Sequence, residues 1–213
     1  MQGASNRYIQ TDLEDCLKKL ALAVAFSVPC VLLCMPAAHA QEADIGIGFG
    51  TLTTSSNSSS GTTQQMGGGL YPSIGVNVIM KHRIGFGGEV AWRAKQNLYF
   101  GVQPFRPILY DFNAVWAPNL GKRATFEAMG GIGGLSSRFY TGTLSCNFVT
   151  CTDYVSSNHF LEHVGAGIRY RVWHNFFLRP EAHYYFINNN NEFSSNSAAR
   201  FGITFGYALI PEQ

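Results

Sequence analysis

The side chains best suited to acid–base or ion-pair chemistry alternate with apolar residues along short segments of the chain. Between Phe177 and Phe186, three charged or imidazole groups stand at alternate positions: Arg179, Glu181 and His183. Such alternation is typical of a β-strand, whose successive side chains point to opposite faces. The same parity predicts one shared polar face with an ionic network, formed by Glu89, Arg93, Glu127, Arg169, Arg171, Arg179 and Glu181, with Asp111 and His183 on the same face.

This polar set contains both signs of charge, which favours pairing. An unpaired charge inside a protein is costly, so we interpret the set as a structural network of salt bridges. Two alternatives stay open, a narrow gated pore and an acid–base site.

The residues around the histidines decide whether the sequence contains a catalytic motif. A hydrolase that modifies lipid A would need a serine activated by a histidine and an acid. His183 has no serine at short spacing, and no activated nucleophile is evident beside His159 or His163. The glycine-rich stretches at 85–88 and 130–134 do not continue into phosphate-binding helices. We therefore predict no catalytic residue, no cofactor and no enzyme activity, with lipid A modification as the alternative.

The N-terminus has the layout of a secretory signal peptide. Lys18 and Lys19 precede an apolar run of 16 residues, 20–35, and Ala38-His39-Ala40 follows. A membrane-spanning helix needs about 20 apolar residues, so this run is short for an anchor. The pattern predicts a signal peptide over 1–40, cut after Ala40, and one domain over 41–213.

Two of the five cysteines, Cys146 and Cys151, lie in the predicted mature part. An isolated pair in an exported protein is most simply a disulfide. No cysteine or histidine spacing indicates a zinc site, so no metal ligand is predicted. The mature part holds 12 Lys and Arg against 10 Asp and Glu, a balance that argues against a nucleic-acid partner.

Eight segments show a period of 2, and their connections alternate between long and short. The segments are 43–53, 67–80, 84–95, 105–117, 124–138, 159–172, 176–187 and 200–209. Long polar connections are expected at 54–66, 96–103, 139–158 and 188–199, with short turns between them. An up-and-down barrel has short turns at one rim and long loops at the other. Eight strands leave an interior that side chains fill, so a wide channel is not expected.

The apolar face of these strands is predicted to meet lipid. Only 13% of the residues are charged, against about 25% in an average soluble protein. The opposite face is mostly Gly, Ala and Ser, too sparse in charge for a water-facing coat. Aromatic residues near both rims predict a girdle at the membrane interfaces, formed by Trp92, Trp116, Tyr170, Trp173 and Tyr207. We predict an all-β, eight-stranded antiparallel up-and-down transmembrane β-barrel, with a soluble barrel or sandwich as the alternative.

Three segments, GAGIRYRVW (165–173), FLRPEAHYYF (177–186) and RFGITFGYAL (200–209), resemble the small outer-membrane β-barrel family of opacity-type and OmpA-type proteins. The resemblance implies an integral protein of a Gram-negative-type outer membrane, with the lipid bilayer and the barrel assembly machinery as partners. It also implies a structural or surface-interacting role, in which the long loops contact an extracellular ligand that the sequence does not identify. One departure is the tail after Leu209, because such barrels commonly end on an aromatic residue.

Overall fold

The computed structural model describes residues 40–54, 64–146 and 151–210. These belong to one compact unit, 40–213. The predicted signal peptide, except for Ala40, and the tail 211–213 lie outside the described residues.

Antiparallel strands dominate the described part of the chain. They are β1 (Ala40–Thr54), β2 (Leu70–Met80), β3 (Ile84–Trp92), β4 (Asn97–Tyr99), β5 (Gln103–Trp116), β6 (Ala124–Cys146), β7 (Cys151–Trp173), β8 (Phe176–Ile187) and β9 (Ser197–Ile210), with a 3-10 turn, η2 (Lys81–Arg83), between β2 and β3. No helix among these residues has the length and apolar character needed to cross a bilayer.

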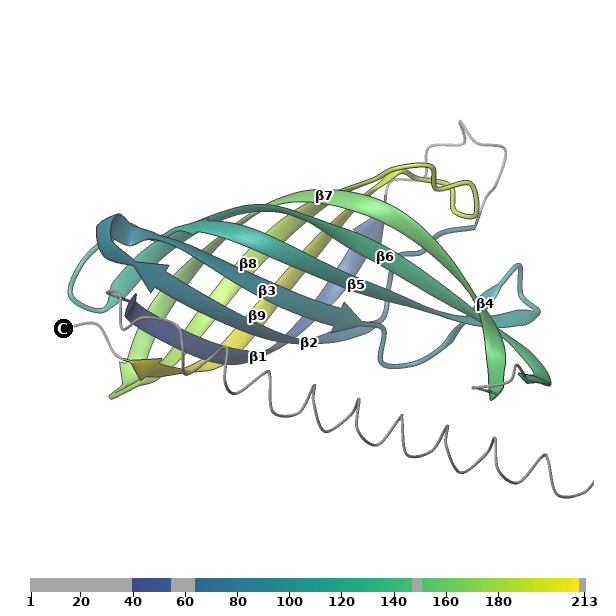
Figure 1. Cartoon of the computed structure of the whole chain (residues 1–213), viewed down its shortest axis with the longest axis horizontal. Helices are drawn as coiled ribbons and strands as arrows, with labels where there is room; N and C mark the ends of the chain where they lie inside the picture. Colours follow the sequence, from purple (N-terminus) through teal and green to yellow (C-terminus); the bar gives the residue numbers. More distant parts are fainter. Residues whose placement is uncertain (1–39, 55–63, 147–150, 211–213) are drawn as a thin grey trace, which may run out of the picture. The chain divides into compact units, whose positions relative to one another are not determined.

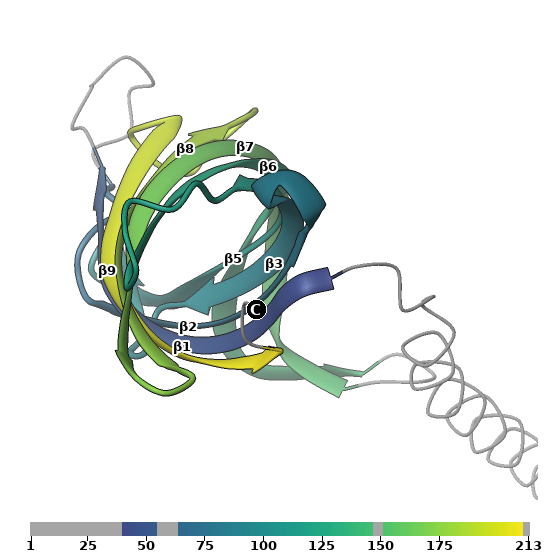
Figure 2. The same cartoon turned by 90° about the vertical axis from the view of Figure 1, so that its left-hand side faces the viewer.

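Eight of the described strands close into a ring, which confirms the predicted barrel (Figures 1 and 2). Each long strand pairs with its sequence neighbours, and β1 pairs with β9 to close the ring. The short strand β4 pairs with β5 beyond the end of β3. We call the end with the connections 81–83, 117–123 and 174–175 the turn end, and the opposite end the loop end.

One predicted connection, 139–158, is wrong. Strands β6 and β7 extend into it as far as Cys146 and Cys151, and they remain paired except for a register shift between Tyr140 and Ser145. Strand β5 pairs with β6 only as far as Phe139. The part of the β6–β7 hairpin beyond this residue therefore forms a two-stranded ribbon (Figure 1). The Ser- and Thr-rich composition of the segment hid this strand, because a ribbon without a core face has no apolar alternation.

The alternation of side chains sets the two faces of the wall. On β9, Phe201 is 54% exposed and faces outward, whereas its neighbour Arg200 is 2% exposed and faces the interior. Pro180 also faces outward, in a stretch where the pairing of β8 with β7 is interrupted. Since proline has no N–H to donate, this interruption explains how the residue is tolerated within a strand.

Apolar side chains fill the interior near both ends. At the loop end, a cluster that we call the plug contains Leu52, Met66, Tyr71, Phe105, Leu109, Leu135, Leu161, Tyr185, Ile187, Phe193 and Ala198. A smaller cluster, Ile79, Val115, Ala117 and Met129, lies toward the turn end. The charged residues therefore occupy the middle of a closed interior.

Candidate functional site in the barrel interior

Arg169 anchors the part of the ionic network nearest the turn end. Its guanidinium donates hydrogen bonds to Glu42 and Asp44 on β1. Its Nε also lies 2.7 Å from Oε1 of Glu127, although the N–H is not aligned for a hydrogen bond. The face of the guanidinium lies over the ring of Phe177, at 4.4 Å from the centroid. One arginine thus joins β1, β6 and β7 across the barrel.

Two further arginines extend the network along the interior. Arg179 places Nη1 2.9 Å from Oε2 of Glu127 and Nε 2.8 Å from Oε2 of Glu181. Arg200 places Nη2 2.5 Å from Oε2 of Glu89 and 3.3 Å from Oε1 of Glu181. Glu181 accepts hydrogen bonds from both arginines, whereas Glu127 accepts one from Arg179 and forms an ion pair with Arg169. Such interleaving suits the forked guanidinium and offsets the cost of burying the charges.

Two members of the predicted set lie toward the two ends of the barrel. Arg93 follows the end of β3 at the loop end, and its buried Nη1 has no hydrogen-bond partner among the described residues. Arg171 is half-buried on β7 near the turn end, close enough to Glu42 to interact with its charge. The remaining five, Glu89, Glu127, Arg169, Arg179 and Glu181, are buried and brought together.

Three central members of the network are absent from the predicted set: Glu42, Asp44 and Arg200. Each follows the interior parity of its strand, so the pattern that found the others identifies them as well. Arg200 and Asp44 stand at or near strand ends in the sequence, where strand boundaries are hardest to set. The completed network has an acceptor or donor on β1, β3, β6, β7, β8 and β9.

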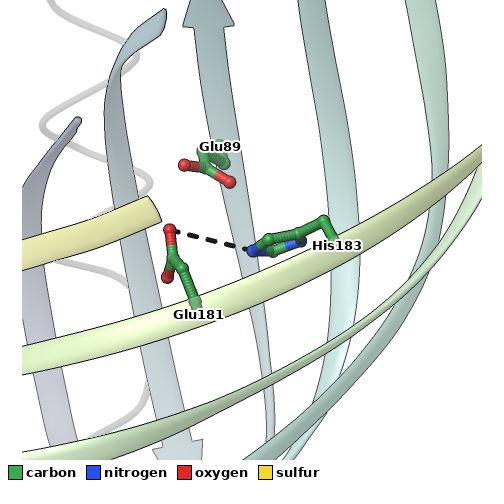
Figure 3. Close-up of side chains that lie close together, drawn as sticks. All are labelled: Glu89, Glu181 and His183. Atoms are coloured by element: carbon green, nitrogen blue, oxygen red, sulfur yellow. Dashed lines mark ion pairs between the residues drawn. The ribbon is translucent and has the colours of Figure 1, made fainter. Parts of the chain in front are cut away.

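Two buried histidines lie beside the network, and three of their four ring nitrogens have no hydrogen-bond partner among the described residues. His163 and His183 stack with ring centroids 5.5 Å apart, and both lie against Tyr185. His163 Nε2 is hydrogen-bonded to Asn113. His183 faces Glu89 of β3 across the interior and lies beside Glu181 on its own strand, with Nε2 3.8 Å from Oε1 of Glu181 (Figure 3). Neither nitrogen of His183 has a hydrogen-bond partner among the described residues.

A serine, a histidine and an acid meet at the loop end, which the sequence did not reveal. Ser157 Oγ lies 3.0 Å from His159 Nε2 and donates to Glu192 Oε1 at 2.5 Å. The same Nε2 lies 2.6 Å from Glu192 Oε2. A catalytic relay needs the acid on one imidazole nitrogen and the serine on the other. This triangle joins both partners to one nitrogen, so it ties a loop in place and does not activate Ser157.

That loop forms part of the plug. Phe193 is buried against the rings of Tyr99, Phe105 and Phe139, and Tyr99 donates its hydroxyl to the carbonyl of Glu192 at 2.9 Å. Burial and the Glu192 charge raise the pKa of the Tyr99 phenol, which keeps this donor protonated. The predicted long polar connection 188–199 is therefore partly wrong, since its centre folds into the barrel mouth.

The five aromatic residues of the predicted girdle all lie at outward-facing positions of their strands. Trp116, Tyr170, Trp173 and Tyr207 are exposed and gather toward the turn end, whereas Trp92 is half-buried at the end of β3. Phe176 links part of the group, with its ring stacked on Trp173 and edge-on to Tyr207. Contact of these rings with the membrane interface stays a prediction.

A disulfide joins Cys146 to Cys151 at the tip of the β6–β7 ribbon. Below the tip, Tyr140 packs on Tyr154, and the Arg138 guanidinium lies 4.8 Å from the centre of the Tyr154 ring. A two-stranded ribbon is marginally stable by itself. The disulfide and the aromatic pair link the two strands on either side of a register shift between Tyr140 and Ser145.

An apolar outer wall, a closed ring of strands and a paired ionic interior define a transmembrane β-barrel. The sequence matches the outer membrane protein beta-barrel domain over residues 23–208. The chain belongs to this family, and it is an integral protein of the outer membrane.

Two solved structures show how far the likeness extends. Ail, the attachment invasion locus protein of Yersinia pestis, solved with the heparin analogue sucrose octasulfate, aligns with a TM-score of 0.54 and 14% identity. The alignment covers 79% of this chain and 98% of Ail. Neisserial surface protein A aligns with a TM-score of 0.54 and 10% identity, over 78% of this chain and 95% of that one. At these identities the likeness concerns the fold alone. None of the curated protein sequences compared with this chain matches it.

Proposed function

We propose that this protein is a non-enzymatic surface-recognition protein of the outer membrane, and that its β6–β7 ribbon contacts a protein ligand. The observation that carries the proposal is the length of this hairpin. β6 and β7 have 23 residues each, whereas the other strands of the ring have 9 to 15. The excess extends beyond the barrel wall and contributes nothing to closing the ring.

The composition of the ribbon favours a protein over a charged polysaccharide. Leu144 is 74% exposed and Val155 is 64% exposed. Between Tyr140 and Val155 the only charged residue of the sequence is Asp153. Sulfated sugars are held by arginine and lysine, and this segment has neither. Exposed apolar and aromatic side chains on a rigid support are typical of protein recognition.

Binding by an intact envelope protein tests the proposal. Vesicles carrying the purified protein are applied to immobilised extracellular-matrix proteins and, separately, to heparin. We expect retention on at least one matrix protein, lost when residues 141–155 are replaced by a two-residue turn, and no retention on heparin. Lys122→Ala, in a turn at the opposite end, is the matched control. Equal binding by the shortened protein to every matrix protein would refute the role of the ribbon.

The same vesicles separate this proposal from its two alternatives. We expect no release of fatty acid from lipid A, because Ser157 donates to Glu192 and not to a histidine base. We also expect no ion conductance, because the plug and the network fill the interior. Lipid A hydrolysis that disappears in Ser157→Ala would replace the proposal with an enzyme.

A further inference from the structure

The described interior holds more negative than positive charge. Six buried carboxylates, Glu42, Asp44, Glu89, Asp111, Glu127 and Glu181, face three buried arginines, Arg169, Arg179 and Arg200. The difference is three negative charges, or one when the half-buried Arg93 and Arg171 are included. Uncompensated charge is costly away from water. The interior therefore needs further protons or cations.

Three potential metal ligands converge inside this negatively charged interior (Figure 3). Glu89 comes from β3, and Glu181 and His183 come from β8. One ligand atom from each lies within 4.8 Å of the others. β3 and β8 are not neighbours in the ring, so the group spans the interior.

His183 supplies the second, independent observation. It is 3% exposed, and neither of its ring nitrogens has a hydrogen-bond partner within the described residues. Buried polar groups nearly always have partners. Its Nε2 points toward Glu181, at 3.8 Å from Oε1, which is too long for a hydrogen bond but leaves room for an ion between the two (Figure 3).

We propose that Glu89, Glu181 and His183 form a binding site for a divalent transition-metal ion such as Zn²⁺. Two carboxylate oxygens and one imidazole nitrogen are ligands that Zn²⁺ accepts, whereas Ca²⁺ and Mg²⁺ prefer oxygen alone. The ion would add two positive charges to an interior that holds more carboxylates than arginines, and it would link β3 to β8. Linear spacing did not indicate a metal site because the ligands come from two strands that are distant in sequence.

Arg200 sets the affinity of this site. Its Nη2 already contacts Oε2 of Glu89 and Oε1 of Glu181, so the guanidinium competes with an ion for the same carboxylates. Glu181 also keeps Arg179 on its other oxygen. We expect Arg200→Gln, which removes the competing charge and keeps a hydrogen-bonding side chain, to bind Zn²⁺ more tightly than the wild type. Weaker binding would contradict the choice of these carboxylates as ligands.

Metal titration of the protein purified from outer membranes in detergent tests the proposal. After treatment with a chelator, the wild type is expected to take up one Zn²⁺ per chain, and Ca²⁺ and Mg²⁺ are expected not to displace it. His183→Gln is expected to bind at least about tenfold more weakly, since even groups that only orient a ligand contribute that much. His174→Gln, at an exposed histidine of the turn end, is the matched control. Far-ultraviolet circular dichroism verifies that each variant is folded.

A second measurement keeps the test decisive if His183→Gln does not fold. In wild-type protein labelled with ¹⁵N-histidine, Zn²⁺ is expected to shift the imidazole nitrogens of His183 and to leave those of His174 unchanged. The proposal is overturned if the wild type retains no Zn²⁺, if His183→Gln binds it equally, or if the shifted signals belong to an exposed histidine.

Discussion

Glu127 on β6 and Arg179 on β8 form an ion pair inside the barrel, with Oε2 2.9 Å from Nη1, although β7 lies between their strands. The side chain of Glu127 is fully buried, and its other oxygen lies near Arg169. This carboxylate therefore stands between two guanidiniums, each of which also contacts another carboxylate: Arg169 contacts Glu42 and Asp44, and Arg179 contacts Glu181. Replacing Glu127 therefore tests how much the interior ion pairs contribute to the free energy of unfolding.

Glu127→Ala is expected to lower the free energy of unfolding by about 3 kcal/mol, because it leaves buried arginines with one carboxylate fewer. Urea unfolding in lipid vesicles measures the change. The double variant Glu127→Ala with Arg179→Gln is expected to lose less than the sum of the two single variants, since the two changes remove both members of one ion pair.

Arg93 supplies the control for this cycle, because it lies at the loop end and no ion pair joins it to Glu127 among the described residues. The pair Glu127→Ala with Arg93→Gln is expected to be additive within about 0.5 kcal/mol. Additivity for Arg179 as well would mean that the interior charges do not act as a network.

The alternation of long and short connections predicted the ring, and strand parity predicted most of its interior charges. Glu89, Glu127 and Arg179 occupy positions where apolar and polar residues alternate clearly, so their face follows from the sequence. Their ion-pair partners do not follow from the sequence. Parity predicts the face on which a side chain lies, but not its position along the barrel axis or its neighbour across the interior. The ion pairs of Arg200 with Glu89 and of Arg169 with Asp44 depend on the closure of β9 on β1, which only the folded ring shows.

The plug and the serine–histidine–acid triangle could not be predicted from the sequence for a related reason. Phe193 and Glu192 lie in a stretch rich in Asn and Ser that has no periodicity. Their positions result from contacts with β4 and β7, which are far away in the chain. Irregular segments that pack by tertiary contacts have no local pattern to detect.

Reaction of the denatured, unreduced mature protein with a thiol reagent is expected to detect no free cysteine, because Cys146 and Cys151 are joined. So short a loop contributes about 2 kcal/mol by the chain-entropy model, and the effect is confined to the ribbon. The double variant with serine at both positions is expected to keep the urea midpoint of the barrel while its ribbon is cleaved faster by protease. Two reactive thiols in the wild type would disprove the bridge.

The purified protein is expected not to conduct as a general porin. Phe105, Phe193 and other apolar side chains fill the loop end, and the salt-bridged arginines cross the middle. Planar-bilayer recordings measure this directly, with a known porin as the positive control. Stable single-channel currents of porin size would show that the interior opens in the membrane.

Export is expected to remove residues 1–40, so that the protein extracted from the envelope begins at Gln41. The Ala38-His39-Ala40 sequence motivates this expectation. Cleavage there leaves Glu42 and Asp44, both partners of Arg169, within the mature chain. Intact-mass measurement of the extracted protein decides the point, and a mass that includes residues 1–40 would contradict the signal-peptide interpretation.

Gly133→Ala is expected to destabilise the barrel by about 1 to 3 kcal/mol, the usual cost of overpacking. A Cβ at Gly133 would lie 1.9 Å from the carbonyl oxygen of Tyr110 and 2.7 Å from Cα of Asp111. Backbone atoms of a paired strand cannot rotate away, so β5 and β6 would have to separate. Gly121→Ala is the matched control, because a Cβ there meets no heavy atom within 4 Å. Urea unfolding in lipid vesicles compares the two, and equal losses would mean that the wall is not closely packed at Gly133.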